Sequence, residues 1–287
     1  MMKVSVKPCQ DYDKDSVMKA VTSAIDQIGG IRKFVKKGET ILLKPNLLVA
    51  TAPEKAVTTH PEIVRAVARL VKKVGGVPVI GDCPSPATKL STALRNSGIY
   101  KICLDEKIRI IDMQKPKAHK VDGKLFKAFT LSKAIDEVDG IINLCKFKTH
   151  MLTILTGAVK NLYGLIPGTI KLRYHATLKT SDLFSDMLLD LYLATKQKVR
   201  LNIMDGVLGM QGQGPFAGEL VWPKMILASD DALALDATFT TIASAKGKVP
   251  LITLAKERGL LSEDSHVDIK YPIRLPNTTK NLSLIHI

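Results

Sequence analysis

Short apolar segments rich in β-branched residues alternate with helical patterns along most of this chain, and that order restricts the folds it can adopt. Strands are predicted at residues 40–44, 77–81, 108–111, 140–144, 200–204 and 224–228. Helices are predicted at residues 16–28, 61–74, 88–96, 153–164, 180–196, 231–245 and 250–258. A helical crossover between strands favours a parallel sheet. We therefore expect an α/β fold with a mostly parallel sheet and helices on both faces, in one or two lobes.

The chain shows no internal repeat and no linker-like stretch, so we expect a single domain over residues 1–276. Residues 277–287 carry no clear pattern, and we expect an unstructured or truncated tail there. No apolar run reaches the roughly 18–20 residues that span a bilayer, and the N-terminus lacks the apolar stretch of a signal peptide. A cytoplasmic location without membrane contact is therefore expected.

The four cysteines are spread through the sequence, at Cys9, Cys83, Cys103 and Cys145. None belongs to a C-x-x-C pair, the spacing typical of local zinc and iron–sulfur ligands. We therefore predict no metal site and no cofactor held by this chain itself.

The balance of charge points to an anionic partner. The chain has 42 Lys and Arg against 27 Asp and Glu, a net charge of +15, and residues 140–181 contain no acidic residue. Aromatic residues make up only 5% of the chain, and no nucleic-acid-binding motif is present, so nucleic acid is not expected. The alternatives are a small anionic ligand, an acidic protein, or a basic surface that only aids solubility.

Polar side chains directly follow five of the predicted strands. In open parallel sheets, ligands bind beyond the carboxyl ends of the strands. The groups at these positions are Lys44 and Asn46, Asp82, the segment 145–150, Asp205, and residues 229–231. We expect them to meet at one edge of the sheet, provided that all five strands are parallel.

The densest basic cluster lies at Lys146, Lys148 and His150. Alternation along an extended segment points these three side chains to one side, where three donors can clamp a carboxylate or a phosphate. Lys160 and Asn161 follow on the predicted helix and complete the candidate ligand-binding set with Lys44, Asn46 and Asp82. A solvated basic face is the alternative interpretation.

His150, His60 and Asp205 are the candidate catalytic residues. His150 is flanked by lysines, which should lower its pKa and favour a neutral base. His60 directly precedes Pro61 at a helix start, where backbone N–H groups can bind an anion. His175 lies in the acid-free stretch and could be a base, a ligand or a structural residue.

Residues 206–218 contain five glycines. Glycine-rich loops allow backbone N–H groups to approach an anion, and we predict that Gly212 and Gly214 do so. The spacing matches neither a Walker loop nor a dinucleotide fingerprint. A mobile lid is the alternative.

Several of these segments together resemble the domain-of-unknown-function family 362. They are LLKPNLL, TTHPEIV, GDCPS, CKFKTH, LTGAVKNLYGLIPG, MDGVLGMQGQGP and ASDDALALD, and the resemblance extends from about Lys3 to Ile273. Members are often described as iron–sulfur proteins, because a ferredoxin-like module with two 4Fe–4S clusters often follows the domain. This resemblance implies clusters only in a C-terminal module that the present sequence lacks. The domain resembles the lactate racemase family more distantly; its members use a nickel pincer cofactor, but no nickel ligand is transferred to this chain.

Three functions follow from the residues and the resemblance. The first is a redox-associated domain that binds a small carboxylate or phosphate in a Lys/His-lined cleft and receives electrons from a 4Fe–4S module. The second is a metal-cofactor enzyme such as an isomerase, with His60, His150, His175 and Asp82 or Asp205 as ligands, although dense lysines disfavour a cation. The third is a non-catalytic domain that docks an acidic redox protein partner. Whether the chain is an enzyme stays open.

Overall fold

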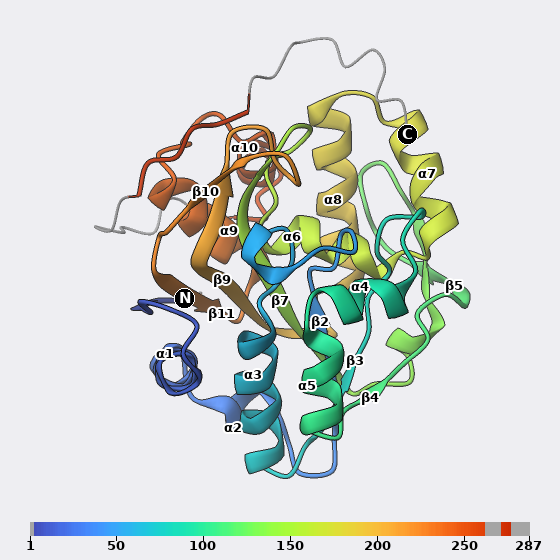
Figure 1. Ribbon diagram of the computed structural model, residues 1–287. Coiled ribbons are helices and arrows are strands. Elements are labelled where there is room, and N and C mark those ends of the chain that lie inside the picture. Colours follow the sequence, from blue (N-terminus) through green and yellow to red (C-terminus); the bar gives the residue numbers. More distant parts are fainter. Residues whose placement is uncertain (1–2, 262–270, 277–287) are drawn as a thin grey trace.

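A mixed sheet of nine strands, with helices on both of its faces, forms the centre of the fold (Figure 1). The structure is a computed structural model that describes residues 3–261 and 271–276. The tail expected at residues 277–287 lies outside the described residues. Among the described helices, none combines the length and the apolar character that a membrane span requires.

Five neighbouring strands, from the interior of the sheet to its β4 edge, are parallel, which confirms the predicted α/β fold. In spatial order they are β9 (Val199–Gln211), β7 (Gly140–His150), β2 (Thr40–Pro45), β3 (Val77–Ile80) and β4 (Arg109–Ile110). The inner strands β2 and β3 are mostly apolar because both faces of the sheet are covered there. In β2, for example, Ile41, Leu42 and Leu43 are all fully buried.

One edge of the sheet is antiparallel, contrary to the expectation that all five polar strand ends meet. β11 (Met225–Ser229) pairs antiparallel with β9, and β1 (Val4–Pro8) pairs antiparallel with β11. The chain returns from β9 through the short strand β10 (Glu219–Val221), also antiparallel to β9, and not through a helical crossover. Residues 229–231 therefore lie at the opposite end of the sheet from the other four groups.

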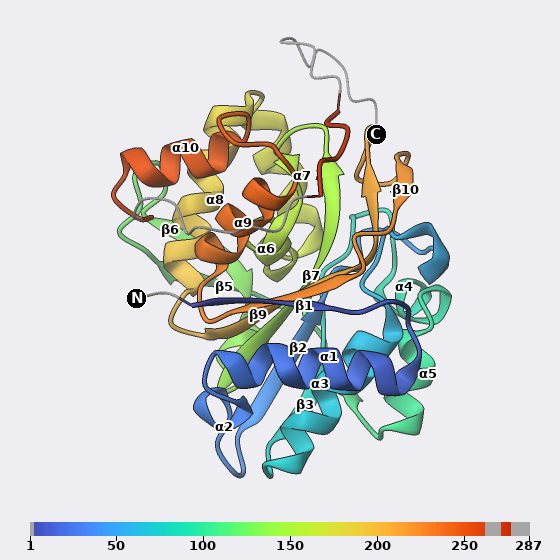
Figure 2. The same ribbon diagram turned by 90° about the vertical axis from the view of Figure 1, so that its left-hand side faces the viewer.

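Two layers of helices sandwich the sheet, and Figure 2 shows them on either side of it. One layer holds α1 (Lys14–Gln27), α3 (Pro61–Lys73), α4 (Leu90–Asn96) and α5 (Ile99–Asp105). The other holds α6 (Gly157–Asn161), α8 (Ser181–Thr195), α9 (Ala232–Ile242) and α10 (Pro250–Glu257). Alternate strand residues feed the two cores: Leu42 packs into one, while Ile41 and Leu43 pack into the other.

The helix predicted over residues 153–164 begins only at Gly157, so that prediction was too long. Residues Ile154–Leu155 form the short strand β8, which folds back onto the end of β7. Gly157 has φ +61° and lies against the Asp236 carboxylate, where a Cβ atom would not fit. This turn starts the short helix α6 beside the end of β7.

A further helix, α7 (Gly168–Thr177), was not predicted. Its residues are mostly exposed or half-buried, and the fully buried one is Lys171. Since α7 has no apolar stripe, the periodicity that reveals core helices was absent from its sequence. The remaining strands, β5 (Pro116–Lys120) and β6 (Ala128–Ser132), form a separate two-stranded sheet.

Candidate functional site

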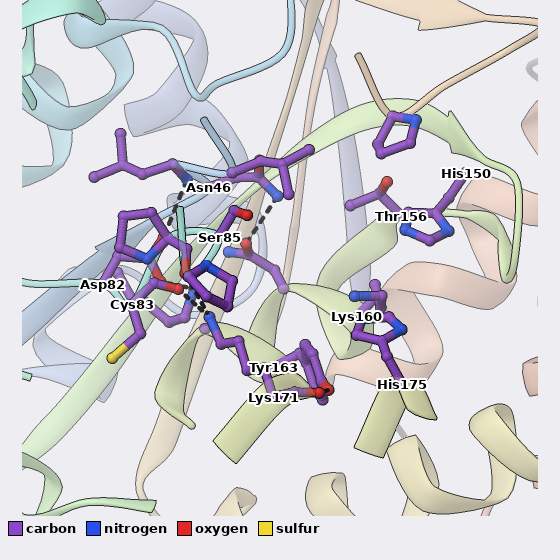
Figure 3. A pocket seen from close by; sticks show the side chains of 18 of the residues that line it. Asn46, Asp82, Cys83, Ser85, His150, Thr156, Lys160, Tyr163, Lys171 and His175 are labelled. Carbon is purple, nitrogen blue, oxygen red and sulfur yellow. Dashed lines mark hydrogen bonds and ion pairs between the residues drawn. The ribbon is translucent and has the colours of Figure 1, made fainter. Parts of the chain in front are cut away.

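A cavity of about 170 Å³ lies beyond the carboxyl ends of β2, β3 and β7 (Figure 3). It brings together seven of the residues predicted from the sequence: Lys44, Asn46, Asp82, Lys148, His150, Lys160 and Asn161. Lys171 and His175 of α7 also line it. Among the described lining residues, Asp82 is the one carboxylate facing four lysines and two histidines.

Lys44 and Asp82 neutralise one another at the base of the cavity. The Lys44 Nζ atom lies 2.9 Å from Asp82 Oδ1, and both side chains are buried. Asp82 Oδ2 also accepts a hydrogen bond from the Leu47 backbone N–H at 3.1 Å. A Cβ atom on Gly164 would overlap this pair, so glycine is required at the point of closest approach. Lys44 is thus committed to a partner within the protein.

Lys148 is held by neutral acceptors. Its Nζ atom donates to Asn46 Oδ1 at 3.1 Å and to the Val57 carbonyl at 2.6 Å. Asn46 Nδ2 in turn donates to Asn161 Oδ1 at 3.0 Å. Burial, followed by repulsion from Lys146 and Lys160, holds the Lys148 pKa well below its usual value. This network fixes Lys148 without supplying a counter-charge.

Lys160 reaches into the cavity from α6 and lies over two aromatic rings. Its Nζ atom is 4.4 Å from the centre of the Tyr163 ring and 5.3 Å from that of Phe184. No other described residue accepts a hydrogen bond from it or forms an ion pair with it. Burial, followed by repulsion from Lys171 and Lys44, lowers the Lys160 pKa to about 7. Both the amine and the ammonium are therefore populated at neutral pH.

His150 presents an N–H group to the cavity. Its Nδ1 atom accepts hydrogen bonds from the backbone N–H groups of Leu152 at 3.1 Å and Thr153 at 3.3 Å. In the neutral ring the proton is therefore on Nε2. Burial, then Lys160 and Lys148, hold the His150 pKa well below its usual value, in the predicted direction. The ring is neutral, as predicted, but its Nε2 atom is a hydrogen-bond donor, whereas the sequence predicted a base.

Lys171 and His175 come from one face of α7, four residues apart. Lys171 Nζ donates to the Cys83 and Pro84 carbonyls, and burial lowers its pKa to about 8. The His175 ring stacks on Phe184 at 4.8 Å, and burial lowers its pKa to about 4. Sequence reasoning left His175 open and did not select Lys171. Their i,i+4 spacing in the acid-free stretch was the available signal.

Lys146, Asp205 and His60 form a separate buried cluster with Tyr12 and do not line the cavity. Lys146 Nζ lies 2.7 Å from Asp205 Oδ2, the Tyr12 hydroxyl donates to Asp205 Oδ1 at 2.7 Å, and the His60 backbone N–H donates to Oδ2 at 2.9 Å. The His60 and Tyr12 rings stack at 3.6 Å. The anion at the start of α3 is thus the carboxylate of Asp205.

The predicted three-residue clamp consequently contains only Lys148 and His150. Alternation along β7 is kept, since Ile142 and Leu144 pack into one core while Cys145 and Phe147 pack into the other. Lys146 instead pairs with Asp205 directly across from it on β9.

The glycine-rich loop does not form the predicted backbone cradle. The Gly212 N–H donates to the Arg274 carbonyl at 2.7 Å, and the Gly214 N–H donates to the Gly212 carbonyl at 2.8 Å. The Gly214 backbone packs against Thr149, where a side chain would not fit. With these two N–H groups already engaged, the loop contributes Pro215 to the cavity lining.

Asp236 supports the site from outside. Its carboxylate accepts hydrogen bonds from the backbone N–H groups of Ala158 at 2.5 Å and Val159 at 2.9 Å, at the first turn of α6. Burial raises its pKa to about 7. Asp236 therefore positions the helix that carries Lys160 and Asn161, and its oxygens are not available to a ligand.

The donor set of the cavity does not fit a bound cation. Within residues 3–261 and 271–276, no group of three or more His, Cys, Asp and Glu side chains could hold a metal ion. The Cys83 thiol is buried and donates to the Met113 carbonyl. His150 and His175 share the cavity with lysines that repel a cation.

Comparison with known proteins establishes the family. Residues 41–241 match the family described as Domain of unknown function (DUF362). The chain belongs to this family. The thylakoid-associated protein sll1697 of Synechocystis sp. is 32% identical over 274 residues, which cover 95% of this chain and 84% of that protein.

One solved structure supports the fold. The lactate racemase apoprotein from Thermoanaerobacterium thermosaccharolyticum aligns over 85% of this chain with a TM-score of 0.51 and 12% identity. This DUF362 chain spans 58% of the length of that protein, and at such low identity the likeness shows the fold alone. A protein from Thermotoga maritima aligns over 71% of this chain and 52% of its own, with a TM-score of 0.43 and 9% identity.

Proposed function

We propose that this DUF362 chain binds a small anionic ligand, a carboxylate or a phosphate, in the cavity beyond β2, β3 and β7. The observation that carries the proposal is the excess of cationic groups. Four lysines and two histidines line the cavity, and its one described carboxylate, Asp82, already pairs with Lys44. Lys148, Lys160 and Lys171 are left without a counter-charge among the described residues.

Such an arrangement is costly in the absence of an anion. Burial, followed by repulsion from neighbouring lysines, lowers the pKa values of Lys148, Lys160 and Lys171. An anion would reverse both effects, because it supplies the missing charge and accepts hydrogen bonds from the ammonium groups and from His150 Nε2. Binding should therefore be coupled to proton uptake by the lysines.

Thermal unfolding with added phosphate, acetate and lactate tests the proposal, at an ionic strength kept constant with chloride. A ligand of the folded state raises the apparent Tm by mass action. We expect at least one anion to raise the Tm of the wild type but not that of Lys160→Met. Lys179→Met is the matched control, because Lys179 is exposed just beyond α7. The proposal is wrong if no anion stabilises the wild type, or if Lys160→Met responds as the wild type does.

The redox context stays a prediction from the family resemblance. It includes electron supply from a 4Fe–4S ferredoxin-like module and the alternative of docking an acidic redox partner. The cytoplasmic location is likewise a prediction from the sequence. Because the Synechocystis relative is named as thylakoid-associated, a membrane-associated location is the alternative. Fractionation of cells that produce the tagged chain distinguishes the two.

A further inference from the structure

We propose that Lys160 forms an imine with the carbonyl carbon of a small 2-oxo acid whose carboxylate is bound by the neighbouring lysines of the cavity. This inference rests on the proposed anion site and names the substrate class of that site. The structural reason is that Lys160 differs from the other lysines there in having no acceptor among the described residues.

Each of the other cavity lysines is already engaged. Lys44 pairs with Asp82. Lys148 donates to Asn46 and to a backbone carbonyl. Lys171 donates to two backbone carbonyls. Their amino groups are held in place by these acceptors, while the Lys160 nitrogen is free to attack a ligand.

The surroundings of Lys160 favour the nucleophilic amine. An ordinary lysine with a pKa near 10.4 is an amine in only about one molecule in 2,500 at pH 7. Burial over the Tyr163 and Phe184 rings, with Lys171 and Lys44 nearby, lowers the Lys160 pKa to about 7. Desolvation beside other cations is a recognised way to activate a lysine toward carbonyl groups.

The other groups match the two ends of a 2-oxo acid. Figure 3 shows Lys160 between His150 and His175, with Lys171 at the other side of the cavity. The Lys171 and Lys148 ammonium groups can receive the carboxylate. His150 Nε2–H can donate to the adjacent carbonyl oxygen and polarise it. Phosphate would bind the cationic groups equally well, but it has no carbonyl carbon with which a free amine could react.

The reaction balances without an external oxidant or reductant. The Lys160 lone pair forms the C–N bond while the C=O π pair moves to oxygen, which gives a carbinolamine after proton transfer from nitrogen to oxygen. A second proton on that oxygen lets it leave as water, and the nitrogen lone pair forms the C=N bond. Loss of the remaining N–H proton returns that proton to the site. The net change is one imine and one water for each amine and 2-oxo acid.

Trapping with sodium borohydride tests this step. The full chain is incubated with pyruvate at pH 7, reduced, digested and mapped by mass spectrometry. Hydride from borohydride converts the imine to a stable secondary amine. We expect the reduced pyruvate adduct on Lys160, competition by lactate, and no adduct at that position in Lys160→Arg. Exposed Lys179 reports the background labelling of a surface amine.

The outcomes separate the two proposals. An adduct on Lys160 well above the Lys179 background supports the imine. If lactate and pyruvate raise the Tm of the wild type but Lys160 is labelled no more than Lys179, the anion site stands and the imine is wrong. If none of phosphate, acetate, lactate and pyruvate raises the Tm and no adduct forms, both proposals are wrong. The imine is also wrong if the wild type carries no label on Lys160 and its other lysines are labelled to the same extent as in Lys160→Arg.

Discussion

Replacing Asp205 by Ala should destabilise the protein strongly, because Asp205 holds together the cluster that lies apart from the cavity. Its carboxylate accepts from Lys146 Nζ at 2.7 Å, the Tyr12 hydroxyl at 2.7 Å and the His60 backbone N–H at 2.9 Å. The side chains of Lys146 and Asp205 have no exposed surface. The substitution therefore leaves a buried ammonium and two further donors without their acceptor.

The expected magnitude follows from that arrangement. Removing one partner of a buried ion pair costs about 3–5 kcal/mol of unfolding free energy. Lys146→Met should cost less, because Asp205 keeps two of its donors. The double variant Lys146→Met/Asp205→Ala should lose less stability than the two single losses combined, since no unpaired buried charge remains.

Urea unfolding followed by circular dichroism measures these differences, with linear extrapolation to water. An Asp205→Ala variant within about 1 kcal/mol of the wild type would refute the structural role, since a lost buried pair costs more than that. The structural role would also be refuted if the loss of unfolding free energy in the double variant equalled the sum of the two single losses. Where Asp205→Ala remains folded, it should keep the Tm response to anions, because the carboxylate does not line the cavity.

Three further predictions concern the cavity. Anion affinity should fall as pH rises through about 7, where Lys160 loses its proton. Titration calorimetry in buffers of different ionisation enthalpy should show proton uptake on anion binding at and above that pH for the wild type, and less for Lys160→Arg. His175→Phe should reduce the loss of unfolding free energy at acid pH. The folded pKa of His175, about 4, lies below its unfolded value of 6.5, so the wild type loses up to about 1.4 kcal/mol per pH unit as pH falls from 6.5 toward 4. If the difference in unfolding free energy between pH 7 and pH 5, measured by urea unfolding, is the same in the variant and the wild type, this prediction is wrong. Gly164→Ala should cost about 1–3 kcal/mol and weaken anion binding, because its Cβ would overlap Asp82 and lie 2.6 Å from Lys44 Nζ; an unaffected variant would show that the ion pair can move.

Much of the fold was predictable because its core strands and helices carry strong hydrophobic patterns. The strand at residues 40–44 and the helix at 61–74 appear as β2 and α3 with nearly the same bounds. The direction of β11 was not predictable, because a short apolar run has the same composition in a parallel and an antiparallel pair. Helix α7 was not predicted because it has no apolar face; its buried residue is Lys171.

The candidate site was likewise predictable only in part. The rule that polar residues gather beyond parallel strands brought Lys44, Asp82 and His150 together correctly. It could not separate Lys146 from Lys148, since Lys146 is engaged by Asp205, the residue opposite it on β9. The engagement of the glycine-loop N–H groups likewise depends on tertiary contacts, which residue spacing does not encode.

The most direct test of a cationic cavity built around Lys160 is an NMR titration of the chain with ¹³C-labelled lysine side chains, in which Lys160→Arg identifies the Lys160 signal. We predict that this signal titrates near pH 7, far below the signals of exposed lysines. Saturating phosphate or pyruvate should shift the signal, and phosphate should move its titration midpoint to higher pH. A Lys160 signal that titrates near the ordinary value of 10.5 and does not respond to either anion would contradict the proposed site.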